Sequence, residues 1–118
     1  MPVTGIGGVF FRAKDPEALN AWYDQHLGVA TKGYTPWEQA AGPTVFQPFK
    51  HDTDYFPADR QWMMNFRVSD LDGMMAALTA AGIEVITKPE WTMPGVGRFA
   101  RIHDLEGNPI ELWEPEEE

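Results

Sequence analysis

The chain has 118 residues, of which 43% are hydrophobic, and its formal net charge at neutral pH is −9. This length predicts one domain over residues 1–118, and the negative charge argues against a nucleic-acid partner, because polyanions would be repelled. The sequence contains no cysteine, which excludes disulfides, thiol catalysis and thiolate metal sites and fits a cytoplasmic protein. No apolar run is long enough to cross a membrane, so we expect no membrane partner.

The first half of the chain, about residues 5–48, predicts a strand, a helix and three further strands. Asp15 is a suitable helix cap, Pro16 suits the first helical position, and Gly28 suits the residue after the helix. The expected elements are strand 6–13, helix 16–27, two weakly patterned strands within 29–40, and strand 43–47.

The second half repeats this plan after a polar linker over residues 49–61. The sequence FRAKD at 11–15 recurs as FRVSD at 66–70, and an amphipathic helical stretch follows each copy. Such a repeat cannot bury its apolar face alone, so we expect the two modules to pack together with a cleft between them. The elements expected in the second module, 62–114, are strand 62–68, helix 71–81, strand 83–87, loop 88–96, strand 98–103, turn 104–108 and strand 109–113.

The order β-α-β-β-β, written twice, resembles the vicinal oxygen chelate superfamily of glyoxalases, bleomycin-resistance proteins and extradiol dioxygenases. The stretch from Asp104 to Glu111, with the sequence DLEGNPIE, is the most specific match. The resemblance implies an α+β fold in which two βαβββ modules form a half-open barrel around a central cleft. It also implies a homodimer, as in many members of the superfamily.

Enzymes of this superfamily hold a divalent metal at four positions, which correspond here to Gly8, Val45, Met63 and Glu111. Glycine and valine offer no ligand atom, and a thioether is a poor ligand for a hard or borderline cation. Only Glu111 keeps a ligand. We therefore expect no metal cofactor, with a metal-assisted site as the alternative.

Strand alternation divides the remaining side chains between the core and the cleft. On strand 98–103 the resemblance, rather than the alternation, assigns side chains to the cleft. The side chains expected to face the helices are Val9, Phe11, Ala13, Phe46, Trp62, Met64, Phe66, Val68, Ile110 and Leu112. The side chains expected to bind a ligand are Phe10, Gln47, Met63, Asn65, Phe99, Arg101 and Trp113, with Trp91 as a lid.

The mixture of aromatic walls and a few polar groups is typical of a small-molecule pocket. We expect Arg101, His103 and Glu111 to project into one cavity lined by Phe99 and Trp113, and we expect the protein to bind a small organic molecule without a metal. The alternative is a lyase or isomerase in which His103 and Glu111 act as catalytic acid and base. A third interpretation is an interaction module with a peptide in the cleft.

Each polar candidate also has a purely structural interpretation. His103 precedes a turn and is as well placed to hold that turn as to face the pocket. Glu111 could be held in an ion pair with Arg101. The segment 51–55, HDTDY, has the composition of an exposed loop, and that interpretation is favoured over a cation site.

Overall fold

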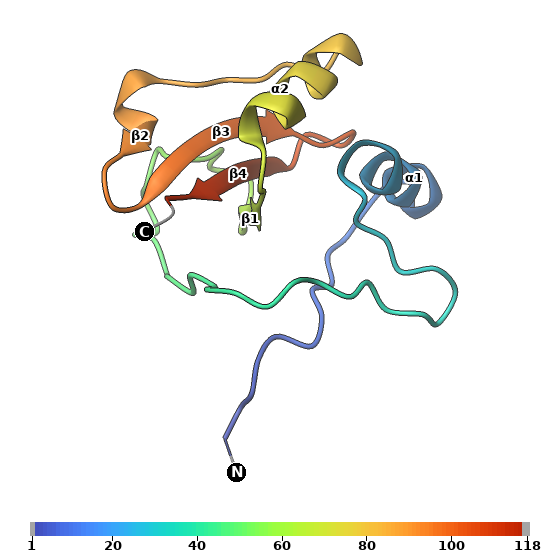
Figure 1. The fold of residues 1–118 in the computed structure, drawn as a ribbon. Coiled ribbons are helices and arrows are strands. Elements are labelled where there is room, and N and C mark those ends of the chain that lie inside the picture. Colours follow the sequence, from blue (N-terminus) through green and yellow to red (C-terminus); the bar gives the residue numbers. More distant parts are fainter. Residues whose placement is uncertain (1, 117–118) are drawn as a thin grey trace.

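The computed structural model describes residues 2–116 and contains two α-helices and one open four-stranded sheet (Figure 1). The strand order is β1-β4-β3-β2; β1 and β4 run parallel, and the other neighbours run antiparallel. This arrangement confirms the α+β class, and the sheet does not close into a barrel. The elements are α1 (Pro16–Leu27), β1 (Met64–Arg67), α2 (Leu71–Ala80), the 3-10 helix η1 (Pro89–Trp91), β2 (Thr92–Met93), β3 (Gly97–His103) and β4 (Pro109–Pro115).

The two helices begin in the same way, as the repeat predicts. The carboxylate of Asp15 accepts a hydrogen bond from the backbone N–H of Ala18 at 3.1 Å, and that of Asp70 accepts one from Gly73 at 3.0 Å. Each bond satisfies a donor that the first turn of a helix leaves free. Helix α1 ends at Gly28, whose φ of 68° lies in the left-handed region that glycine tolerates best.

The hydrophobic core lies between the helices and one face of the β3–β4 pair. Side chains with 0% exposure alternate along these two strands with residues that face the other way, as strand geometry requires. The predicted helix-facing positions of β4, Ile110 and Leu112, are therefore confirmed. The buried cluster consists of Leu19, Tyr23, Leu71, Leu78, Ala100, Ile102, Ile110 and Leu112.

The strands predicted for the first half are wrong for this structure. Between residues 2 and 63 the described chain forms helix α1 and the isolated bridge Lys32–Thr35, but no strand over 6–13, 29–40 or 43–47. A strand is held by backbone bonds to a neighbour, and these segments lie apart from the sheet (Figure 1). The expected core residues Val9, Phe11, Phe46 and Trp62 are therefore 50%, 53%, 81% and 73% exposed.

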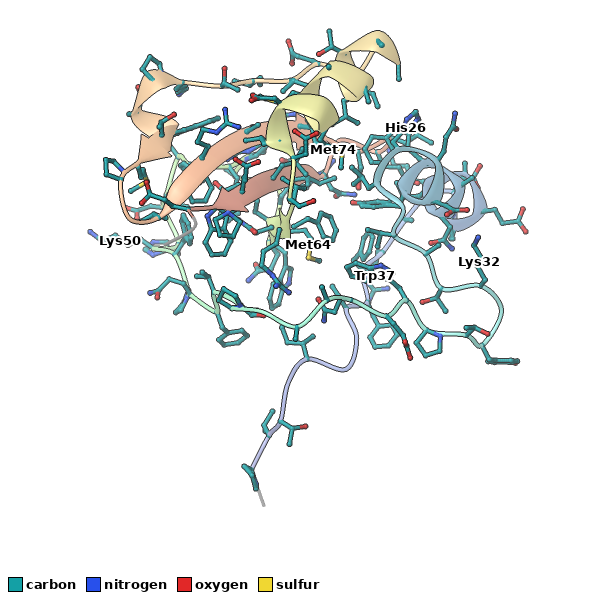
Figure 2. The ribbon with its side chains drawn as sticks, viewed as in Figure 1. His26, Lys32, Trp37, Lys50, Met64 and Met74 are labelled. Atoms are coloured by element: carbon teal, nitrogen blue, oxygen red, sulfur yellow. The ribbon has the colours of Figure 1, made fainter. Side chains whose placement is uncertain are left out.

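The segment after α1 contacts β1 through the ring of Trp37 and through the carbonyl of Ala40, which accepts a hydrogen bond from Arg67 at 3.0 Å. Trp37 lies on the side of this coil that faces the sheet, and its ring centroid is 6.2 Å from that of Phe66 (Figure 2). In the second half, the strand predicted over 83–87 is reduced to one bridge between Ile86 and Arg101. All four strands of the sheet thus come from the second half of the chain.

Candidate functional site

Three polar side chains lie in a row across the face of the sheet opposite to the core. In the strand register Asn65 of β1 is paired with Glu111 of β4, and Glu111 is paired with Arg101 of β3. Paired residues on neighbouring strands project to the same side. The register therefore brings together three of the residues that the sequence predicted for the cleft.

Glu111 is almost fully buried, with 9% of its surface exposed, and its carboxylate is held by two neutral donors. The side-chain amide of Asn65 donates to Oε1 at 2.7 Å, and the hydroxyl of Tyr55 donates to Oε2 at 2.5 Å. No ion pair among residues 2–116 includes Glu111. The predicted alternative of a Glu111–Arg101 ion pair is therefore wrong, because hydroxyl and amide donors occupy both carboxylate oxygens.

Arg101 is equally buried, at 7% exposure, and it too lacks a charged partner among the described residues. Its Nη2 donates to the backbone carbonyl of Tyr55 at 2.9 Å, while Nε is buried without a hydrogen-bond acceptor. The guanidinium centre lies 5.0 Å from the ring centroid of Tyr55 and 5.9 Å from that of Trp91. Aromatic faces thus stabilise the cation that no carboxylate neutralises.

Tyr55 reaches this site from the linker and covers it. Burial, followed by the hydrogen bond to the Glu111 carboxylate and its charge, raises the pKa of Tyr55 to about 12, although Arg101 opposes the shift. The phenol therefore remains protonated at neutral pH and acts as a donor. The aromatic ring of Tyr55 also lies 6.1 Å from that of Trp91, in an edge-on arrangement.

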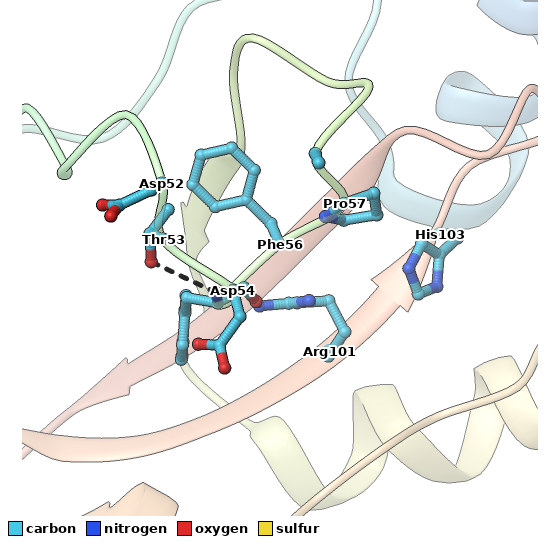
Figure 3. A pocket seen from close by; sticks show the side chains of 9 residues that line it. Asp52, Thr53, Asp54, Phe56, Pro57, Arg101 and His103 are labelled. Carbon is cyan, nitrogen blue, oxygen red and sulfur yellow. Dashed lines mark hydrogen bonds between the residues drawn. The ribbon is translucent and has the colours of Figure 1, made fainter.

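Two open cavities flank Tyr55 and Arg101. The larger, of about 580 Å³, lies between the segment 52–58 and the side chains of Arg101 and His103 (Figure 3). The smaller, of about 370 Å³, is bordered by Asp54, Tyr55, Ile86, Lys88, Trp91 and Arg101. Asp54, Tyr55 and Arg101 therefore border both cavities, whose volumes lie in the range of ligand sites.

The other predicted site residues differ in whether they border these two cavities. Trp91 borders the smaller cavity, as a lid residue would, and the exposed segments that carry Phe10 and Gln47 border neither cavity. The half-buried Met63 also borders neither. Phe99 and Trp113 instead stack on each other with ring centroids 6.0 Å apart.

The expectation of one cavity shared by five side chains is therefore wrong in part. Arg101 and His103 border the same cavity, whereas Glu111 lies beneath Tyr55. The indole N–H of Trp113 donates to the carbonyl of Val96, which fixes this ring away from the cavity. His103 and Glu111 have no hydrogen bond to each other in the described part of the chain.

Of the four positions that the resemblance assigns to a metal, only Glu111 has a side chain that is a good ligand for a hard or borderline cation. Gly8 and Val45 lie on exposed coil of the first half, and Val45 is 69% exposed. Both oxygens of Glu111 already accept hydrogen bonds from Asn65 and Tyr55. Within residues 2–116 no three histidine, aspartate or glutamate side chains gather as a metal-binding cluster.

Tyr55 is the site residue that the sequence analysis missed. The signal was the presence of aromatic residues in an otherwise polar linker, since an exposed loop has little use for them. Phe49 packs against Tyr55 and Phe56 with ring centroids 5.7 and 5.6 Å away. The favoured interpretation of 51–55 as an exposed loop holds for His51, Asp52 and Asp54 but not for Tyr55.

Comparison with known protein families gives one match over most of the chain. A family model described as a glyoxalase-like domain matches residues 8–113. No curated protein matches the chain. None of the described helices has the length and apolar character needed to span a membrane.

Two solved structures from Streptomyces sp. CB03234 share the fold. TnmS3, an antibiotic binding protein, superposes with a TM-score of 0.63 at 21% identity, over 98% of this chain and 99% of its own. A glyoxalase/bleomycin resistance protein superposes with a TM-score of 0.51 at 22% identity, over 86% of this chain and 92% of its own.

Proposed function

The chain belongs to the glyoxalase-like domain family, and from that premise we propose that it binds a small organic molecule in the cleft over Arg101 and Glu111. No metal takes part at the position of Glu111, and the biological use is sequestration or sensing of the ligand. One observation carries the proposal: two oppositely charged side chains, each more than nine-tenths buried, face the cleft without pairing with each other.

Buried charges that form no ion pair destabilise a fold, so their presence on a cleft face favours a functional role over a structural one. Aromatic rings of Tyr55 and Trp91 stand over Arg101, and cavities open on both sides of it. Aromatic walls with a few placed polar groups are what recognition of a small organic molecule requires. The neighbour TnmS3, described as antibiotic binding, supports the same use of the fold.

We further propose that the functional form is a homodimer. The first half exposes apolar side chains that its sequence pattern assigns to strands, while β1 stands at one edge of the sheet. A second copy related by a two-fold axis offers each chain both a strand edge and an apolar surface. The large hydrophobic residues of this half with the highest exposure are Tyr34 (103%), Phe10 (96%), Phe46 (81%) and Val45 (69%).

Native mass spectrometry of freshly purified protein tests these proposals together. We expect two subunits, a retained organic molecule and no metal. Arg101→Gln should reduce the fraction of protein that carries the molecule about tenfold, because a buried charged hydrogen-bond partner is lost. Arg12→Gln, which removes an exposed arginine, is the matched control and should leave that fraction unchanged. A monomer that retains a divalent ion and no organic molecule would contradict the proposal.

The acid–base alternative has one supporting observation, since His103 borders the larger cavity together with Arg101. It requires that a bound compound be converted and that His103→Ala lower turnover by about 10²–10⁴-fold with little change in binding. If the unmodified protein converts no bound compound, binding remains the function that the site supports. Conversion that survives the His103→Ala substitution would exclude His103 as the catalytic acid or base.

A further inference from the structure

Tyr55 makes the contacts in this cleft that a bound aromatic compound would make. Its hydroxyl donates to Glu111, its ring lies 5.0 Å from the guanidinium centre of Arg101, and its backbone carbonyl accepts from Nη2 of that arginine. One residue of the chain therefore offers a phenol donor, an aromatic face and a carbonyl acceptor to the two buried charges.

The fit of Tyr55 to Arg101 is incomplete. Nε of Arg101 is buried and has no acceptor, although the guanidinium borders both cavities. A single carbonyl oxygen cannot satisfy the paired donors of a guanidinium, whereas a carboxylate can accept from two of them at once. A ligand with a carboxylate would thus satisfy a buried donor that the tyrosine leaves unpaired.

The segment that carries Tyr55 is attached to the sheet mainly by this residue. Within the described residues, the hydrogen bonds that join 51–58 to the sheet are those of Tyr55 to Glu111 and Arg101. The neighbours Asp52, Asp54 and most others of this segment are exposed. A segment with so few buried contacts can open without disturbing the core.

We propose, building on the function proposed above, that the ligand is an aromatic compound with a phenolic hydroxyl and a carboxylate across the ring, and that it binds by displacing Tyr55. The ligand hydroxyl then donates to Glu111, its carboxylate accepts from Arg101, and its ring lies beside Trp91. Lys88, 5.3 Å from the Trp91 ring centroid, adds positive charge at the rim of the smaller cavity. Asp54 borders both cavities and leaves with the displaced segment.

If the ligand displaces Tyr55, removing this side chain changes the affinity in the opposite direction to removing a wall residue, that is, a residue that contacts the bound ligand. The apparent affinity of a site equals its intrinsic affinity multiplied by the fraction of molecules in which the site is open. Removal of an occupant raises that fraction and strengthens binding, whereas removal of a wall residue weakens binding. The sign of the change therefore separates the two roles.

The probe is para-hydroxycinnamate, with its binding measured by isothermal titration calorimetry. The matched compounds are para-methoxycinnamate, which lacks the hydroxyl donor, and para-cresol, which lacks the carboxylate. We expect each to bind about tenfold more weakly than the probe, because a buried charged group then loses its partner. Tyr55→Ala should strengthen binding of the probe about fivefold or more, and Tyr34→Ala, at a residue that is 103% exposed, should change nothing.

The substitutions on the sheet assign each contact. Glu111→Gln should remove most of the difference between the hydroxy and methoxy compounds, and Arg101→Gln most of the difference between the probe and para-cresol. Tyr55→Phe keeps the ring and loses the hydroxyl, so it should strengthen binding less than Tyr55→Ala. It also serves as the conservative variant if Tyr55→Ala fails to fold, which thermal unfolding will show.

Three outcomes overturn the inference. Equal binding of the three compounds, or weaker binding to both Tyr55 variants, would show that Tyr55 is a wall and that the hydroxyl is not recognised. No binding of the probe would also overturn it. If native mass spectrometry then still shows a retained organic molecule of another class, the proposed function survives while the ligand class fails; if it shows none, both fail.

Discussion

Residues 11–27 and 66–80 are two copies of one local design, in which a Phe-Arg segment leads into an aspartate-capped helix. The backbone angles at the caps, φ −133° and ψ 86° at Asp15 and φ −142° and ψ 83° at Asp70, are nearly the same. The outcome beyond the helices differs. The second half forms β1, β3 and β4, whereas the first half remains extended coil.

The difference separates what a chain specifies locally from what it specifies through partners. A helix cap needs only residues three positions apart, and both copies form it. A strand needs a neighbour with free backbone groups. Within the second half, β4 provides that neighbour to both β1 and β3, and no strand of the described first half is in that position.

Two tyrosines join the halves by the same kind of bond. Tyr23 of α1 donates to Asp104 at 2.7 Å, and Tyr55 of the linker donates to Glu111 at 2.5 Å. In each pair a phenol from outside the second module meets a buried carboxylate of that module. The first pair lies in the core and holds α1, whereas the second lies in the cleft and holds a segment that we expect to move.

The largest expected contrast is in the core. Ile110 of β4 is 0% exposed, and Ile6 of the first half is 52% exposed. Ile110→Ala should reduce the free energy of unfolding by about 2–5 kcal/mol, since it leaves a cavity in a packed interior. Ile6→Ala should cost less than about 0.5 kcal/mol in the monomer. Urea denaturation of both variants measures the contrast.

The same pair of variants also tests the dimer. A larger cost of Ile6→Ala that grows with protein concentration would place this residue in an interface between subunits. If Ile110→Ala and Ile6→Ala reduced the free energy of unfolding equally at every protein concentration, the contrast between the two halves would be contradicted.

The bond that holds α1 should have the next largest effect. Tyr23→Phe removes the donor to Asp104, whose carboxylate is buried at 6% exposure. We expect a loss of about 1.5–3 kcal/mol, the range for hydrogen bonds to charged groups. Tyr34→Phe, at a fully exposed site, is the matched control and should be neutral. If Tyr23→Phe leaves the free energy of unfolding unchanged, the N–H donors of Glu106 and Asn108 are sufficient for the Asp104 carboxylate without the tyrosine.

The helix caps test the repeat itself. Asp15→Ala and Asp70→Ala should each cost about 1 kcal/mol, because each removes one bond to a free N–H of the first turn. Similar costs are expected because buried residues of both helices, Leu19 and Leu71 among them, belong to one core cluster. Thermal unfolding of the two variants gives the comparison. A cost confined to Asp70→Ala would show that α1 unfolds separately from the core.

The parts that could be predicted from the sequence are the local ones. The caps at Asp15 and Asp70, the helix end at Gly28 and the alternation along β4 follow from spacing and residue type. The shared face of Asn65 and Glu111 was predicted from strand alternation, and that of Arg101 from the family resemblance, whereas the register that pairs them was not predicted. The position of Tyr55 over Glu111 was not predicted, because the contacts of a linker depend on the surface against which it packs rather than on its own sequence pattern.

The smallest expected effect is local and separates the two tyrosines by pH. Burial and the Glu111 carboxylate raise the pKa of Tyr55 to about 12, above the value of about 10 for a free tyrosine. The fold thus favours the neutral phenol. The stability contributed by this contact is fully present below a pH of about 10 and is lost as the pH rises through about 12. Burial also raises the pKa of Tyr23, the more deeply buried of the two.

We therefore expect the linker contact to open at a pH at which α1 is still held. Trp91, whose ring lies 6.1 Å from that of Tyr55, should report the opening as a change in fluorescence. The change should precede the loss of helical circular dichroism and should vanish in Tyr55→Phe and in Trp91→Phe. A single transition shared by fluorescence and circular dichroism would mean that the two tyrosine contacts break together. The linker would then be part of the folded core, and its displacement by a ligand would require the whole domain to unfold.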